Sequence, residues 1–236
     1  MCRRSTVPEF TERTKLDLMK RALIISGFAL TLIGYAAKPT EHLPRKFKAS
    51  STQDAADLRS GDILFQTMPG GQSEAIALAT GSKWTHVGIV FKENEEWIVY
   101  EAVGPVKATP LDEWVKQGDH GHFAAKRLKL ADEKLGPEAI VALRAGADRF
   151  MGIAYDRQFG WSDETIYCSE LVWKMYADAL NIELCSPKPM RDHVLGSEVV
   201  QRTMKERYGS APPLDELMIG PGALFDCPLL VTVLEK

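Results

Sequence analysis

The residue best suited to covalent chemistry is Cys168, which opens a predicted amphipathic helix over 168–180. Free N–H groups and the positive end of the dipole at a helix N-terminus stabilise a nearby anion. They favour the thiolate, the nucleophilic form of cysteine, and can donate to an oxyanion on an attacked carbonyl. Ser162 and Asp163 precede this helix and are expected to cap it. The competing interpretation is an inert core cysteine, because free cysteine is among the most buried residue types.

His86 is the candidate base for this nucleophile, and Glu101 is the candidate acid that orients the base. His86 lies at the start of a predicted strand over 85–91, where Gly88 shares its face and leaves room beside the imidazole. Glu101 lies in a second predicted strand over 96–103. If the two strands pair, the carboxylate can accept a hydrogen bond from the ring and stabilise imidazolium, as in a catalytic triad. Taken singly, each could instead be a structural histidine or a glutamate facing water.

Hydrophobic periodicity predicts an α+β domain that positions these residues. Apolar, β-branched runs indicate strands, and apolar residues at helical spacing indicate helices. Asn94 is expected in a hairpin turn, Gly104 and Pro105 at the end of that hairpin, and Ser73 at a helix cap. The predicted strands are 63–65, 85–91, 96–103, 123–128 and 229–234, and the predicted helices are 73–80, 110–115, 137–151, 168–180 and 198–208. This order indicates an antiparallel meander packed on a few helices.

The composition is that of an ordinary globular protein. The chain has 236 residues, of which 45% are hydrophobic and 26% charged, enough to bury a real core. The net charge of −3 leaves no basic excess, so no nucleic-acid partner is expected.

The N-terminus predicts export. Lys20 and Arg21 precede a short apolar run over 22–37, a pattern typical of a signal peptide, and Met19 is a candidate for the true start. An uncleaved anchor is the alternative, so residues 1–37 are interpreted as signal peptide or anchor. A linker follows over 38–54, and the catalytic domain is expected over 55–236. The expected location is the periplasm, or a membrane anchorage facing the periplasm or exterior, with membrane association through the N-terminal segment.

The remaining cysteines and histidines predict no metal site and no cofactor. Cys185 and Cys227 could form a disulfide in an exported protein, although spacing alone does not establish it. The sequence has no CxxC pair, so a structural zinc site has little support. His120 and His122 alternate around one glycine but lack a set of completing ligands, and a solvated loop is the favoured interpretation.

Several segments together resemble a known family, the YiiX/YaeF-like branch of the NlpC-type superfamily. The likeness covers about residues 58–233, nearly all of the chain beyond the leader. The segments that carry it are GDILFQ at 61–66, THVGIV at 85–90, YEAVGPVK at 100–107, IAYDRQFGWSD at 153–163 and YCSELVWK at 167–174. They stand in the family's order, with His-bearing strands before the Cys-bearing helix.

The resemblance implies a circularly permuted papain-like fold, with an antiparallel sheet or small barrel packed on helices. It implies Cys168 as nucleophile, His86 as base and Glu101 as orienting acid, with Tyr167 lining the pocket or supporting the oxyanion site. Gln66 follows a strand expected near the site and is a candidate oxyanion donor.

The expected function is that of a thiol hydrolase of the amidase or peptidase kind. It would cleave an amide or ester of a cell-envelope peptide or lipid-linked substrate through a thioester acyl-enzyme. The alternatives are a lipid or amine acyltransferase that uses the same cysteine and histidine, and a non-catalytic envelope binding module.

Overall fold

The structure is a computed structural model that describes residues 56–236. The expectations for the signal peptide or anchor over 1–37 and for the linker over 38–54 lie outside the described residues. None of the helices within 56–236 combines the length and the hydropathy needed to cross a bilayer.

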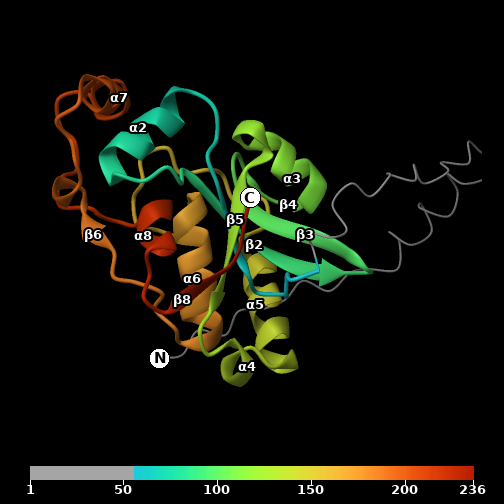
Figure 1. The fold of residues 1–236 in the computed structure, drawn as a ribbon. Coiled ribbons are helices and arrows are strands. Elements are labelled where there is room, and N and C mark those ends of the chain that lie inside the picture. Colours follow the sequence, from blue (N-terminus) through green and yellow to red (C-terminus); the bar gives the residue numbers. More distant parts are fainter. Residues whose placement is uncertain (1–55) are drawn as a thin grey trace, which may run out of the picture. The chain divides into compact units, whose positions relative to one another are not determined.

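A six-stranded antiparallel sheet forms the centre of the described chain (Figure 1). Its strand order is β4-β3-β2-β1-β5-β8, and every neighbouring pair is antiparallel. The strands are β1 Ile63–Gln66, β2 His86–Glu93, β3 Glu96–Ala102, β4 Val106–Pro110, β5 Phe123–Leu128 and β8 Leu230–Glu235. Of the two expected forms, a sheet or a small barrel, the strand order therefore corresponds to the sheet.

Helices and short elements cover the sheet and extend beyond it. The helices are α2 Gly71–Thr80, α3 Leu111–Gln117, α4 Ala131–Lys134, α5 Pro137–Phe150, α6 Cys168–Leu180, α7 Glu198–Tyr208 and α8 Pro221–Phe225. Two short strands, β6 Lys188–Pro189 and β7 Leu217–Met218, form a separate ribbon. Figure 1 shows α7 beside α2, and contacts between their residues confirm that the two helices are neighbours.

Strand alternation divides the core into two apolar clusters, one on each face of the sheet. One cluster joins strand residues such as Ile63 and Ile89 to α5 and α6. The other joins Leu64, Val90 and Val99 to α3. Helix α5 and helix α6, which carries the candidate nucleophile, therefore pack on one face, and α3 covers the opposite face.

The hairpin between β2 and β3 has the expected turn and a fixed register. Asn94 and Glu95 both have positive φ, 47° and 69°, as a two-residue hairpin turn with right-handed twist requires. The register sets Gly88 directly opposite Glu101. A Cβ atom on Gly88 would lie 2.6 Å from Val99 Cγ1, so only glycine fits at this position.

One local expectation was wrong and one strand was not predicted. The hairpin ends as expected, since β3 stops at Ala102 and Gly104 and Pro105 lie in the following bend, but the chain then returns as β4 along β3. This edge strand is short and contains a lysine and a proline, so its strand signal is weak. Helix α2 begins at Gly71 rather than at a Ser73 cap, and the Ser73 hydroxyl instead bonds the hydroxyl of Thr85.

Candidate functional site

Cys168 is the first residue of α6 and is buried, with 3% of its surface exposed. The helix start is held by Glu170, whose Oε2 accepts a hydrogen bond from the Tyr167 N–H at 3.3 Å. Because the first N–H groups of a helix have no intrahelical acceptor, the N–H of Cys168 is available to a substrate oxygen.

The expected cap by Ser162 and Asp163 was wrong, although both residues do support the helix. Lys174, one turn beyond Glu170, donates to the Ser162 carbonyl and to Asp163 Oδ1, each at 2.7 Å. The same ammonium lies 2.8 Å from Glu170 Oε1. Lys174 therefore links the loop before α6 to Glu170 in the first turn of the helix, without capping the helix N-terminus.

His86 and Glu101 form a buried pair on adjacent strands. His86 Nε2 lies 2.6 Å from Glu101 Oε2, and the two side chains are 5% and 0% exposed. Strands β2 and β3 pair with each other, which the contact between the carboxylate and the imidazole requires. Cys168 lies close enough to the same imidazole for its side chain to raise the pKa of His86. The structure therefore groups the thiol, the imidazole and the carboxylate in one site.

The charges and hydrogen bonds around His86 favour its protonated form. Burial by itself lowers the pKa of His86, but hydrogen bonds to Cys168 and Glu101, and the charges of both, raise it to about 9. Burial raises the pKa of Glu101, yet the bonds and charges of His86, Thr109 and Lys107 lower it below its usual value overall. The arrangement can therefore hold an imidazolium beside a carboxylate at neutral pH.

Glu101 is satisfied by side chains that sequence reasoning did not select. Thr109 Oγ1 donates to Glu101 Oε1 at 2.6 Å and Gln117 Nε2 donates to the same oxygen at 3.3 Å. Lys107 Nζ lies 3.6 Å from it. Thr109 and Lys107 lie on β4. Because this strand was not predicted from the sequence, neither residue was expected near Glu101. A buried carboxylate needs such partners, which hold Glu101 in place against the imidazole.

Gln66 and Tyr167 lie near the site in different ways. Gln66 pairs with His86 in the sheet register and is fully buried. Its amide nitrogen contacts Met68 Sδ at 3.4 Å, its oxygen faces Gly118, and it does not line the pocket at Cys168. Tyr167 does line that pocket, and its hydroxyl accepts a hydrogen bond from the Ile219 N–H at 3.1 Å. The oxyanion role expected of Gln66 stays a prediction.

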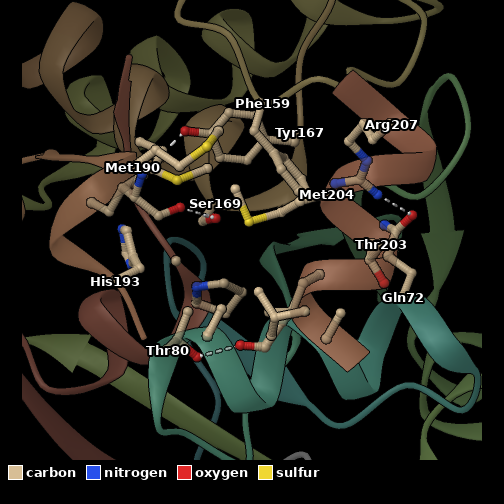
Figure 2. A pocket seen from close by; sticks show the side chains of 18 of the residues that line it. Gln72, Thr80, Phe159, Tyr167, Ser169, Met190, His193, Thr203, Met204 and Arg207 are labelled. Atoms are coloured by element: carbon tan, nitrogen blue, oxygen red, sulfur yellow. Dashed lines mark hydrogen bonds between the residues drawn. The ribbon is translucent and has the colours of Figure 1, made fainter. Parts of the chain in front are cut away.

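A pocket opens at Cys168 between α2, α7 and the start of α6, and we call it the helical pocket (Figure 2). The pocket is partly open, and the empty space within it, open solvent included, is about 760 Å³. Most of its lining is apolar, and three flexible methionines contribute to it. The main apolar lining residues are Ala75, Ile76, Ala79, Phe159, Met190, Leu195, Val200, Met204, Met218 and Ile219. Such a lining fits an extended apolar group and adapts to its shape.

The aromatic loop over 155–161, before α6, forms one wall of the helical pocket. Tyr155 and Phe159 line the pocket, and Phe159 packs edge-on against Tyr167. Asp156 holds the loop by accepting the N–H groups of Gln158 and Gly160, both at 2.7 Å. The loop is therefore a fixed wall rather than a loose cover.

Tyr155 is a candidate oxyanion donor, a role that the sequence did not indicate. Its hydroxyl accepts a hydrogen bond from Gln72 Nε2 at 3.3 Å, which leaves its own proton free to donate. Burial and the neighbouring Cys168 raise its pKa above the usual value, so the hydroxyl keeps its proton at neutral pH. A phenol near the nucleophile is a suitable donor to an oxyanion.

The other two described cysteines and the histidine pair lie elsewhere. Cys168, Cys185 and Cys227 are all free thiols, and the last two each contact a backbone carbonyl oxygen, of Ala223 and of Leu184 respectively. Burial and Cys227 raise the pKa of Cys185 to about 12, which marks it as unreactive beside Cys168. Within residues 56–236, no group of three or more His, Cys, Asp and Glu side chains is placed to hold a metal ion, His120 and His122 included.

Comparisons with known proteins agree with this architecture. The family model of the permuted papain-like amidase enzymes, YaeF/YiiX, C92 family, matches residues 57–232. An uncharacterised protein, YiiX of Escherichia coli K12, is 40% identical over 178 residues, which are 75% of this chain and 87% of the relative. The crystal structure of "metalloprotein yiiX" from Escherichia coli O157:H7 superposes with a TM-score of 0.73 at 40% identity. The match covers 76% of this chain and 98% of the chain in that crystal structure. The expected permuted papain-like α+β fold is confirmed.

Proposed function

Because the chain belongs to the permuted papain-like amidases of the YaeF/YiiX family, we propose that it cleaves its substrate through a Cys168 thioester. The observation that carries the proposal is the grouping of the three residues: Glu101 Oε2 lies 2.6 Å from His86 Nε2, and Cys168 is close enough to raise the pKa of His86. The family makes the chain an amidase-type hydrolase. The assignment of nucleophile, base and orienting acid to these three residues is our own.

In the proposed mechanism, His86 takes the proton of the Cys168 thiol, and the thiolate attacks the carbonyl carbon of an amide or ester. The imidazolium, stabilised by Glu101, then protonates the leaving amine or alcohol as the carbon–nitrogen or carbon–oxygen bond breaks. Water, activated by the neutral imidazole, attacks the thioester and releases the acid and the free thiol.

Two groups at the pocket wall are suited to bind the oxyanion of the tetrahedral intermediate. The first is the N–H of Cys168 at the start of α6, and the second is the hydroxyl of Tyr155. Tyr155 lines the same pocket as Cys168, whereas Gln66 does not. Tyr155 is therefore the better placed second donor, and Gln66 is the alternative.

The helical pocket favours an apolar acyl group over a polar peptide as the part of the substrate that fills it. Its methionines and aliphatic residues offer few hydrogen-bond partners for peptide groups, whose burial without partners is costly. A lipid-linked amide or ester, of the kind found in the cell envelope, matches this lining. We place the reaction at the envelope because residues 20–37 resemble an export signal or anchor.

Turnover and labelling of single variants of the full chain test the proposal. Decanoyl p-nitroanilide, an amide with a chromogenic leaving group, is the substrate, and iodoacetamide labels the nucleophile. We expect Cys168→Ala to lose turnover by roughly 10³-fold or more, and His86→Ala by roughly 10²-fold or more, with slower labelling at Cys168. Cys185→Ala is the matched control, because its thiol is partly exposed and lies outside the pocket.

Full turnover by Cys168→Ala would remove the proposal, as would labelling of Cys185 and Cys227 at the same rate as Cys168. In that case the protein would instead be interpreted as a non-catalytic binding module. Product analysis in the presence of an amine or alcohol acceptor separates hydrolysis from transfer, because the two reactions share every step up to the thioester.

A further inference from the structure

Arg207 is the one permanently charged residue among those that line the helical pocket in the described chain. It comes from the last turn of α7 and is partly buried. Figure 2 shows it at one end of the pocket, with Met190 and His193 at the other end. Burial lowers the pKa of His193, so that imidazole is neutral at neutral pH.

Every partner of Arg207 in the described residues is neutral. Its Nη2 donates to Gln72 Oε1 at 3.3 Å, and its guanidinium lies over the ring of Phe159, 4.6 Å from the centroid. The neighbouring Tyr208 hydroxyl is also neutral and donates to the Gln158 carbonyl oxygen at 2.8 Å. The carboxylate of Asp156, on the same loop as Phe159, instead accepts two backbone N–H groups. The guanidinium therefore has no carboxylate partner within ion-pair distance in residues 56–236.

This arrangement leaves Arg207 suited to bind an anion. A partly buried guanidinium gains from an anionic partner, to which its planar fork donates two parallel hydrogen bonds. The stacking on Phe159 and the bond to Gln72 fix its plane in advance, so little conformational entropy is lost when an anion binds. Gln72 also bonds Tyr155, so the anion site and the proposed oxyanion donor share one support.

We propose that Arg207 binds an anionic group of the substrate, a carboxylate or a phosphate ester, while the apolar part of the same substrate fills the helical pocket. The substrate class is thus an anionic acyl amphiphile, an acyl amide or ester with a negative charge close to the scissile bond. This inference rests on the proposed function for its reaction, but the binding that it describes requires no turnover.

Three probes with one acyl chain test the charge. N-decanoylglycine carries a carboxylate, N-decanoylphosphoethanolamine carries a phosphate ester, and N-decanoylglycinamide is the neutral match of the first. Their kcat/KM is measured with the wild-type chain, and their Kd with Cys168→Ala. We expect at least one anionic probe to be favoured over the neutral probe by roughly 10- to 100-fold, the range of a charge-assisted hydrogen bond. The stronger anionic probe identifies carboxylate or phosphate as the source.

The variants Arg207→Gln, Arg207→Lys and Arg202→Gln separate recognition from support. Arg207→Gln is expected to bring the anionic-to-neutral ratio to about 1, and Arg207→Lys to restore part of it, because the charge remains and the fork is lost. Arg202→Gln removes an equal charge from an exposed position of α7 outside the pocket, and it should keep the wild-type ratio. A purely structural Arg207 would weaken all three probes alike and lower the unfolding midpoint.

Equal binding of anionic and neutral probes by Cys168→Ala, with no change in Arg207→Gln, would overturn the inference and leave the proposed amidase in place. Preferential binding of an anionic probe without cleavage of any amide would support the anion site and contradict the proposed amidase activity. A ratio that falls equally in Arg202→Gln would also overturn it, because the effect would then come from the general charge of α7.

Discussion

The site joins two regions of opposite character, the His86–Glu101 pair on the sheet and the helical pocket. The pair is polar and buried, and the two oxygens of Glu101 are fully used by His86, Thr109 and Gln117. The pocket is apolar and partly open, and its lining comes from helices and loops. Polar groups in a sheet are held in place by the strand register and by their hydrogen bonds, whereas flexible methionine side chains adapt.

This difference assigns separate tasks to the two regions. Proton transfer tolerates little displacement, because the catalytic groups must stay within hydrogen-bond distance. Recognition of an acyl chain depends on shape and apolar area, which several side chains can supply. Cys168 belongs to both regions, since its side chain raises the pKa of His86 and it also lines the pocket. Changes in the sheet should therefore affect rate and pH dependence, and changes in the pocket should affect substrate choice.

The strongest test of the sheet region is Glu101→Gln, which keeps the shape of the side chain and removes its charge. We expect kcat/KM for decanoyl p-nitroanilide to fall roughly 10²-fold. In the wild type the rate should decline as the pH rises through about 9, where His86 loses its proton. The carboxylate helps to raise that pKa, so the variant should show the decline at lower pH. A pH–rate profile measures both effects. An unshifted profile in the variant would mean that Glu101 does not influence the pKa of His86.

Gly88→Ala tests whether the register of the pair depends on close backbone approach. The added Cβ would lie 2.6 Å from Val99 Cγ1 and 3.0 Å from the Tyr100 carbonyl oxygen. Overpacking of this kind costs about 1–3 kcal/mol of unfolding free energy, which denaturant titration measures. Gly196→Ala is the control near the pocket, where a Cβ meets nothing within 4 Å, and should change stability by less than about 0.5 kcal/mol. Equal stability of both variants would contradict this account of the hairpin.

The smallest expected effect is a change of chain-length preference in the helical pocket. Met204→Trp adds bulk to the lining, so the pocket should lose room for about two methylene groups. At about 0.8 kcal/mol per buried methylene, decanoyl should lose roughly 10-fold in kcat/KM relative to butyryl p-nitroanilide. Met151→Trp is the control, because Met151 is exposed and lies outside the pocket. A constant ratio in Met204→Trp would mean that the acyl chain binds elsewhere.

The sequence by itself determined the elements and the chemical types of the site. Strand and helix periodicity placed Cys168 at a helix start and His86 and Glu101 on the two strands of a hairpin, because these patterns are local. It did not predict β4, whose short edge segment has little apolar alternation, and so it missed the contact of Thr109 with Glu101. It also placed the cap of α6 wrongly, since Lys174 bonds Ser162 and Asp163 across the packed helix.

Only the tertiary structure decided which residues surround the nucleophile. The helical pocket combines α2, the loop over 155–161, α6 and α7, and the segment over 190–221, which are far apart along the chain. Their meeting depends on how the helices pack, and no short-range periodicity encodes that packing. For the same reason Arg207 looked like one charge among several on an exposed helix. Its position over Phe159, without a carboxylate partner among the described residues, is a property of the folded chain.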